Sequence, residues 1–264
     1  MTIRQREDED GGTGTLGKAM AVLEAVALAE GPMRFTDVLC LSGQPRGTLH
    51  RQLSHLVQEG LLDLNADHAY VPGLRLLKLA SASWARNEFR MVAAPFLEAL
   101  HRETGETVHL GVLRGREIIY LDKVESRQAV RMNSQIGNAS PVYCTGVGKA
   151  ALSALSGPAL DAILADIEYR RFTPATITDR AGLIAELEAI RRSGVAFDRE
   201  EHEPGIRCVA APVFDAERAL AAGVSVTGPA YRVGEERLDG WAPLVRDTAR
   251  AITAELSARL GPQR

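Results

Sequence analysis

The segment DREEHEPGIRC, residues 198–208, combines side chains that could do nucleophilic or acid–base chemistry. It holds Asp198, three glutamates, His202 and Cys208 within eleven positions. A cysteine-dependent hydrolase would need a thiolate held beside a base, and further histidines stand at positions 101 and 109. No local cysteine-hydrolase signature surrounds Cys208 or Cys144, and a buried cysteine often serves as a small hydrophobic residue. A hydrolase is therefore the alternative interpretation, and we expect no catalytic residue.

The glycine turn GVGKA, residues 146–150, is similar to a phosphate-binding loop but lacks two of its requirements. Tyr143 stands where that motif needs its first glycine, and Ala150 follows the lysine where Ser or Thr is required. A glycine turn that opens a helix still presents N–H groups and a positive dipole end, which suit a small carboxylate. Ordinary helix capping is the alternative.

Two hydroxyls alternate in the strand-like segment GVSVTGP. Ser225 and Thr227 are two residues apart, so both side chains point to the same face of a strand. They face either a ligand or water. Together with the glycine turn they would bind a carboxylate through neutral donors, which avoids the cost of desolvating a buried Lys or Arg.

A local basic patch lies in QPRGTLHRQLSHLVQEGLL, residues 44–62. Leucine or valine at positions 49, 53, 56 and 57 forms one helical face, and residues 44–58 carry two arginines, two histidines and no acid. The whole chain has a net charge of −3, which argues against a protein that coats nucleic acid generally. The patch instead predicts a helix that meets DNA locally, and a solvated amphipathic helix is the alternative.

The elements around this patch resemble a winged helix-turn-helix. The spacing predicts a helix over 16–29, a short helix that ends at Gly43, the basic helix, and two short strands around the loop 65–68. In a helix-turn-helix the second helix enters the major groove with its N-terminal residues toward the base edges. The candidates for contact with double-stranded operator DNA are Arg34, Arg46, Gly47, Thr48, His50, Arg51 and Ser54.

The rest of the chain alternates helix-forming and strand-like segments. Residues 73–105 are nearly all helix formers, and Pro95 is expected to separate a connecting helix from the next one. Hairpin signals follow at 106–124, with a further strand at VRMN, three more strands between 195 and 228, and a final helix over 239–260. Asp179 precedes a further helical run, which Gly194 is expected to end. This pattern predicts an α+β domain around a mostly antiparallel sheet.

The length of 264 residues predicts two domains, and no apolar run is long enough to cross a membrane. The charged N-terminus lacks the apolar core of a signal peptide, so we expect a cytoplasmic protein with three reduced cysteines. Their spacing matches no zinc site, and we expect neither a metal nor another cofactor.

Taken together, these segments resemble the IclR family of bacterial transcriptional regulators along nearly the whole chain. LGKAMAVLEAVA resembles the family's first helix, and PRGTLHRQLSHLVQEGLL resembles its recognition helix and the start of its wing. Further matches in order are ETGETVHLGVL, TGVGKAAL, RFTPATITD, GVAFDREEHEPGIRCVAAPVFD and SVTGPAYRV. Gly47 departs from the serine usual in the family, and Val147 is bulkier than the usual alanine or glycine.

The resemblance implies a ligand-responsive regulator that forms a homodimer or a dimer of dimers. It implies a disordered tail over 1–14, a winged helix-turn-helix over 15–72, a linker helix over 73–90 and a GAF-like effector-binding domain over 91–264. The effector is expected to be a small organic acid, and a DNA-independent sensor is a third interpretation. Carried over by position, the effector-binding candidates are Met132, Gly146, Val147, Asp198, Ile206, Cys208, Ser225 and Thr227.

Overall fold

The structure, a computed structural model, describes residues 14–129 and 134–260. The chain forms two compact units, and the boundary between them falls between Arg86 and Asn87. Met132 and the strand expected at VRMN lie outside the described residues, as does the tail expected over 1–14, apart from Gly14. Within those two ranges, no helix combines the length and the apolar character needed to cross a bilayer.

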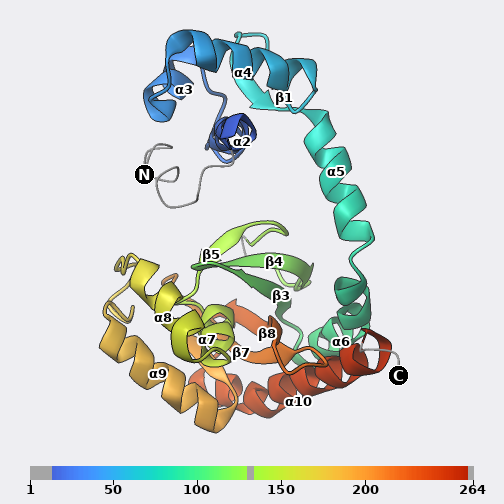
Figure 1. Cartoon of the computed structure of the whole chain (residues 1–264). Coiled ribbons are helices and arrows are strands. Elements are labelled where there is room, and N and C mark those ends of the chain that lie inside the picture. The colour runs from blue at the N-terminus through green and yellow to red at the C-terminus, as the bar shows by residue number, and fades with distance from the viewer. Residues whose placement is uncertain (1–13, 130–133, 261–264) are drawn as a thin grey trace. The chain divides into compact units, whose positions relative to one another are not determined.

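The N-terminal unit has the predicted helices and hairpin (Figure 1). The basic helix is α4, whose leucines at 49, 53 and 56 are buried against the first two helices, so the predicted apolar face is confirmed. Gly43 ends the second helix in the left-handed region at φ 58°, where glycine carries no steric penalty. The elements are α2 (Gly14–Ala27), α3 (Phe35–Ser42), α4 (Arg46–Gln58), β1 (Leu62–Leu64), β2 (Tyr70–Pro72) and α5 (Leu74–Ala85).

The expectation of one linker helix over 73–90 with a break at Pro95 is wrong. Helix α5 ends at Ala85, and α6 (Glu88–Thr104) continues through Pro95. The break falls at Asn87, whose side chain accepts a hydrogen bond from the Arg90 N–H at 2.9 Å and caps α6. Proline in a helix interior is unfavourable, but α6 buries Val92, Ala93, Leu97 and Leu100 in the domain core, and this packing holds the helix together.

The C-terminal unit is built on a six-stranded sheet in which every pair is antiparallel among the described residues, which confirms the predicted α+β class. The strand order is β5-β4-β3-β8-β7-β6, so strands distant in sequence lie side by side (Figure 1). The strands are β3 (Thr107–Arg114), β4 (Glu117–Val124), β5 (Ala139–Pro141), β6 (Ala196–Arg199), β7 (Ile206–Phe214) and β8 (Leu220–Pro229).

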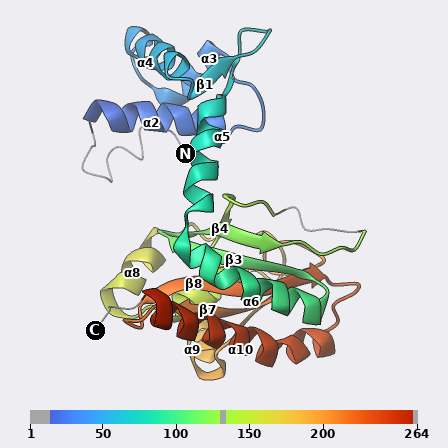
Figure 2. The ribbon, with the colours of Figure 1, turned by 90° about the vertical axis from the view of Figure 1, so that its right-hand side faces the viewer.

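Helices cover both faces of this sheet. On one face, α6 packs beside α10 (Glu235–Leu260), which begins four residues before the predicted start at 239 (Figure 2). On the other face lie α7 (Gly146–Ser153), α8 (Gly157–Asp166) and α9 (Arg180–Ser193), which form a second core. Helix α9 begins at the predicted cap Asp179 and ends at Gly194, in the left-handed region.

Candidate functional site

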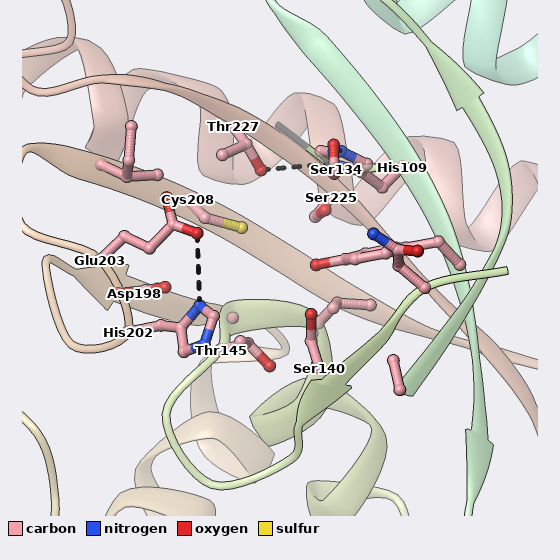
Figure 3. Close-up of a pocket in the computed structure, with 16 residues that line it drawn as sticks. His109, Ser134, Ser140, Thr145, Asp198, His202, Glu203, Cys208, Ser225 and Thr227 are labelled. Atoms are coloured by element: carbon pink, nitrogen blue, oxygen red, sulfur yellow. Dashed lines mark hydrogen bonds and ion pairs between the residues drawn. The ribbon is translucent and has the colours of Figure 1, made fainter. Parts of the chain in front are cut away.

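A cavity of about 180 Å³ lies between the α7 face of the sheet and the loop that follows β6 (Figure 3). We call it the sheet cavity. Strand alternation explains which residues reach it. Val224 and Val226 of β8 pack into the core beneath α6 and α10. Ser225 and Thr227 alternate with them along the strand and therefore point to the opposite face, toward the cavity.

The sheet register aligns polar side chains from four strands beneath the cavity. His109 of β3 pairs with Ser225, while Thr227 pairs with Cys208 of β7, which in turn pairs with Asp198 of β6. All five residues are buried, with 6% exposure or less. The antiparallel register therefore assembles hydroxyl, imidazole, thiol and carboxyl groups that are up to 118 positions apart in sequence.

The glycine turn opens α7 above this floor. Thr145 caps the helix by accepting the Gly148 N–H, and Gly146 and Val147 line the cavity. A Cβ at Gly146 would stand 2.9 Å from the Cys208 Sγ atom, so the close approach requires glycine. Val147 fits because the sheet beneath it carries glycine: a Cβ at position 223 would come within 2.7 Å of its Cγ2 atom.

A buried ion pair holds α7 against the loop after β6. The Lys149 Nζ donates to Glu201 Oε1 at 2.5 Å and to Glu186 Oε1 of α9 at 3.0 Å. Lys149 is fully buried, and neither it nor its two partners are among the residues that line the sheet cavity. The lysine of the glycine turn therefore serves the packing of α7, and it leaves the cavity without a lysine or arginine among its described lining residues.

His109 is a neutral hydrogen-bonding group at one end of the cavity. Burial, together with a smaller contribution from the nearby Lys123, lowers its pKa to about 3. Its Nε2 atom lies 2.7 Å from Ser134 Oγ, its Nδ1 atom lies 3.5 Å from Thr227 Oγ1, and its ring packs 4.8 Å from that of Tyr120. At neutral pH this imidazole can donate or accept one hydrogen bond but carries no charge.

The protonation states of Cys208 and Cys144 do not suit a cysteine-dependent hydrolase. Burial, together with a smaller contribution from the neighbouring Asp198, raises the pKa of Cys208 to about 12. Burial likewise raises the pKa of Cys144. Both groups are thiols at neutral pH, whereas nucleophilic attack needs a thiolate. Burial also raises the pKa of Asp198 to about 7, although its carboxylate accepts the Glu201 N–H at 2.7 Å.

Seven of the eight predicted effector-binding residues line this one cavity, and the eighth, Met132, lies outside the described residues. Their effector-binding role remains a prediction. From the sequence, His109 and His202 were candidates only as possible bases, and the other lining residues carried no local signal that singled them out. The alternation of Val108, His109 and Leu110 was a usable signal for an inward polar residue in β3. The remaining missed lining residues are Tyr120, Ser134, Asn138, Ala139, Ser140, Thr145 and Glu203.

Six of the seven predicted DNA-binding residues lie on α4, and the seventh, Arg34, is the N-cap residue of α3. Arg46, His50 and Arg51 are exposed, and neither arginine forms an ion pair with an acid in the described part of the chain. The Arg46 guanidinium lies 5.1 Å from the centre of the Phe35 ring, which directs it along the end of the helix. A Cβ at Gly47 would meet nothing within 4 Å, so packing does not require glycine there. Gly47, Ser54 and Arg34 are also exposed, and Thr48 is half-buried.

Comparison with known proteins covers both units. The family model described as "Bacterial transcriptional regulator IclR C-terminal" matches residues 82–254, and the "IclR helix-turn-helix domain" model matches residues 15–65. The chain is 33% identical over 253 residues to the HTH-type transcriptional regulator BhcR of Paracoccus denitrificans, covering 96% of this chain and 90% of BhcR.

Two solved structures extend the comparison. The crystal structure of Thermotoga maritima IclR has a TM-score of 0.69 and 33% identity, and the match covers 92% of this chain and 98% of that one. An IclR homolog from Microbacterium hydrocarbonoxydans, solved in complex with 4-hydroxybenzoate, has a TM-score of 0.75 at 24% identity, over 93% of this chain and all of that one. At that identity the second likeness establishes a common fold.

Proposed function

Because the chain belongs to the IclR family of bacterial transcriptional regulators, we propose that it binds operator DNA through α4 and is controlled by a small organic acid in the sheet cavity. That it is a DNA-binding regulator and not an enzyme follows from the family. The contacting residues, the effector and the domain roles are the proposal. The observation that carries it is that seven residues named from sequence line one cavity.

The DNA-binding proposal assigns the exposed face of α4 to the major groove. Arg51 lies in the middle of that face and Arg46 at its start, where a recognition helix contacts base edges. A lost arginine contact with a base should cost about 1–3 kcal/mol and relax specificity at one operator position. A lost phosphate contact would weaken all sequences alike and lower the salt dependence of binding.

A mobility-shift assay with the gene's own upstream DNA tests this proposal. Arg51→Ala should weaken operator binding at near-physiological salt. A control substitution at a buried residue would disturb folding and is therefore not informative. Arg75→Ala is the better control, because Arg75 is also an exposed arginine but lies on α5, where it forms an ion pair with Glu59. Equal affinity of Arg51→Ala and the unchanged protein would refute the placement of α4.

The effector proposal rests on the size and the donors of the sheet cavity. A cavity of about 150 Å³ can hold a benzene ring, so about 180 Å³ suits a short acid or a single ring. Ser225, Thr227 and the N–H groups at the start of α7 offer neutral donors to a carboxylate. Val147 and Ile206 supply apolar walls.

Calorimetry against named acids tests the effector proposal. The panel is pyruvate, glycolate, benzoate and 4-hydroxybenzoate, the last because the Microbacterium homolog was solved with it. At least one should bind to the full chain, and Ser225→Ala should weaken it by roughly 0.5–3 kcal/mol as a hydrogen bond to a charged group is lost. Binding of AMP or of a cationic amine in place of every acid would refute the effector class while leaving the family assignment intact.

A further inference from the structure

The sheet cavity has an unusual charge balance for a site that takes an anion. Two of its lining residues, Asp198 and Glu203, are carboxylates, and none of its described lining residues is a lysine or arginine. Lys149 lies nearby but is engaged by Glu201 and Glu186. His109 lines the cavity in its neutral form. A carboxylate that enters therefore meets a second buried carboxylate without a cation lining the site to offset the repulsion.

Asp198 is the buried member of this pair of carboxylates. It is 5% exposed and lies on the wall of the cavity (Figure 3). Its Oδ1 atom accepts the Glu201 N–H at 2.7 Å, which holds the loop after β6 in place. Glu203 lies on that loop, exposed over about half of its side chain, and stands 4.0 Å from the His202 ring. Water can screen Glu203, whereas Asp198 has little access to solvent.

Burial is the main cause of the raised pKa of Asp198, and the charge of Glu201 acts in the same direction. Lys149, which is paired with Glu201, and the backbone N–H groups of Glu201 and His202 favour the charged form of Asp198. The Cys208 thiol of the neighbouring strand β7 and the Tyr120 hydroxyl of β4 are uncharged at neutral pH, so neither offsets a negative charge on Asp198. The full set of titratable groups around Asp198 is Lys149 of α7, Cys144 before α7, Tyr120 of β4, Cys208 of β7, and Glu201, His202 and Glu203 of the loop.

We propose that the protein takes up one proton with each organic acid molecule it binds, and that the carboxyl group of Asp198 holds this proton. The inference rests on the proposed function. The Asp198 carboxylate takes a proton from solvent and becomes a neutral carboxylic acid. Its O–H group then donates a hydrogen bond to the ligand carboxylate. Such a charge-assisted bond is stronger than one between neutral partners, and protonation leaves one negative charge on the pair formed by Asp198 and the ligand carboxylate instead of two.

The proton linkage makes binding depend on pH in a defined direction. Since burial raises the pKa of Asp198 to about 7, the Asp198 side chain of the unliganded protein is largely protonated at pH 6 and largely ionised at pH 8.5. The apparent Kd of the acid should therefore change little below pH 6 and rise by about tenfold per pH unit above pH 7. A neutral amide analogue of the same acid should show no such rise.

Calorimetry of the full chain in two buffers measures the proton directly. The probe is the tightest-binding acid among pyruvate, glycolate, benzoate and 4-hydroxybenzoate, titrated at pH 8 in phosphate and in Tris, whose ionisation enthalpies differ. We expect an uptake close to one proton per acid at pH 8 and well below one at pH 6. Binding with no uptake at pH 8 overturns the inference alone, whereas failure of all four acids to bind overturns the proposed function as well.

Three variants assign the proton to a residue. Asp198→Asn should bind the acid with a Kd that no longer depends on pH and without proton uptake, while His202→Gln and Glu203→Gln should each retain the uptake. Uptake that persists in Asp198→Asn overturns the assignment. If that variant does not fold, infrared difference spectra of the unchanged protein decide: the band of a protonated carboxylic acid should appear on binding at pH 8, and its absence refutes the proposal.

Discussion

Replacing Lys149 by methionine should destabilise the C-terminal unit, because the substitution leaves Glu201 buried without the ammonium group that now contacts it. Lys149 Nζ lies 2.5 Å from Glu201 Oε1 and 3.0 Å from Glu186 Oε1. The side chains of Lys149 and Glu201 are 1% and 10% exposed, while Glu186 keeps 33% exposure and can turn to water. The second oxygen of Glu201 is buried and accepts no hydrogen bond among the described groups.

Removing one partner of a buried ion pair typically costs about 3–5 kcal/mol. In a domain of this size each kcal/mol shifts Tm by about 2–4 °C, so the expected loss is roughly 6–20 °C. Methionine conserves most of the side-chain volume, so the loss reports the stranded carboxylate rather than a cavity. The double variant Lys149→Met/Glu201→Gln should recover much of the loss, since it removes the uncompensated charge.

Urea unfolding followed by tryptophan fluorescence is the assay. The chain has two tryptophans, so a Trp84→Phe background leaves Trp241, which is buried in the C-terminal unit. Arg180→Met is the control: its pair with Asp161 is exposed at 47% and 63%, and its loss should cost less than about 1 kcal/mol. If Lys149→Met cost no more than this control, the reasoning about the buried pair would be refuted.

Three further predictions concern assembly, thiols and pH. Leu77 of α5 is 67% exposed, which favours an interface between subunits; Leu77→Glu should yield monomers in light scattering at micromolar concentration, and an unchanged chain that is already monomeric would contradict this. Exposed Cys40 should react with a thiol reagent in the folded protein, while Cys208 reacts only after unfolding, because burial keeps it protonated; rapid native labelling of Cys208 would refute that account. Asp198 has a folded pKa raised from 3.8 to about 7, so its stabilising contribution is complete below pH 4 and is lost as pH rises to about 7. In urea unfolding, Asp198→Asn should therefore gain stability relative to the unchanged protein across that window, and a constant difference between the two would count against the raised pKa.

Local periodicity was enough to predict which residues lie on the exposed face of α4 and which point into the cavity from β8. In α4 the leucines at a helical spacing define the buried side, so the exposure of Arg46, His50 and Arg51 follows from 3.6 residues per turn. In β8 the two-residue period places Ser225 and Thr227 on one face in the same way. The cap at Asp179 and the glycine stops at 43 and 194 were readable for the same reason, because each depends on a few neighbouring residues.

Tertiary structure decided everything that depends on partners distant in the chain. The strand order brings His109 beside Ser225 and Asp198 beside Cys208, and strand periodicity alone carries no information about which strands pair. Lys149 reads as a surface residue of a helix, yet two acids 37 and 52 positions away make its burial possible. Pro95 reads as a break, yet α6 continues because its apolar face fills the core. The raised pKa of Asp198 has the same origin, since the sequence specifies the carboxyl group while only packing removes the water around it.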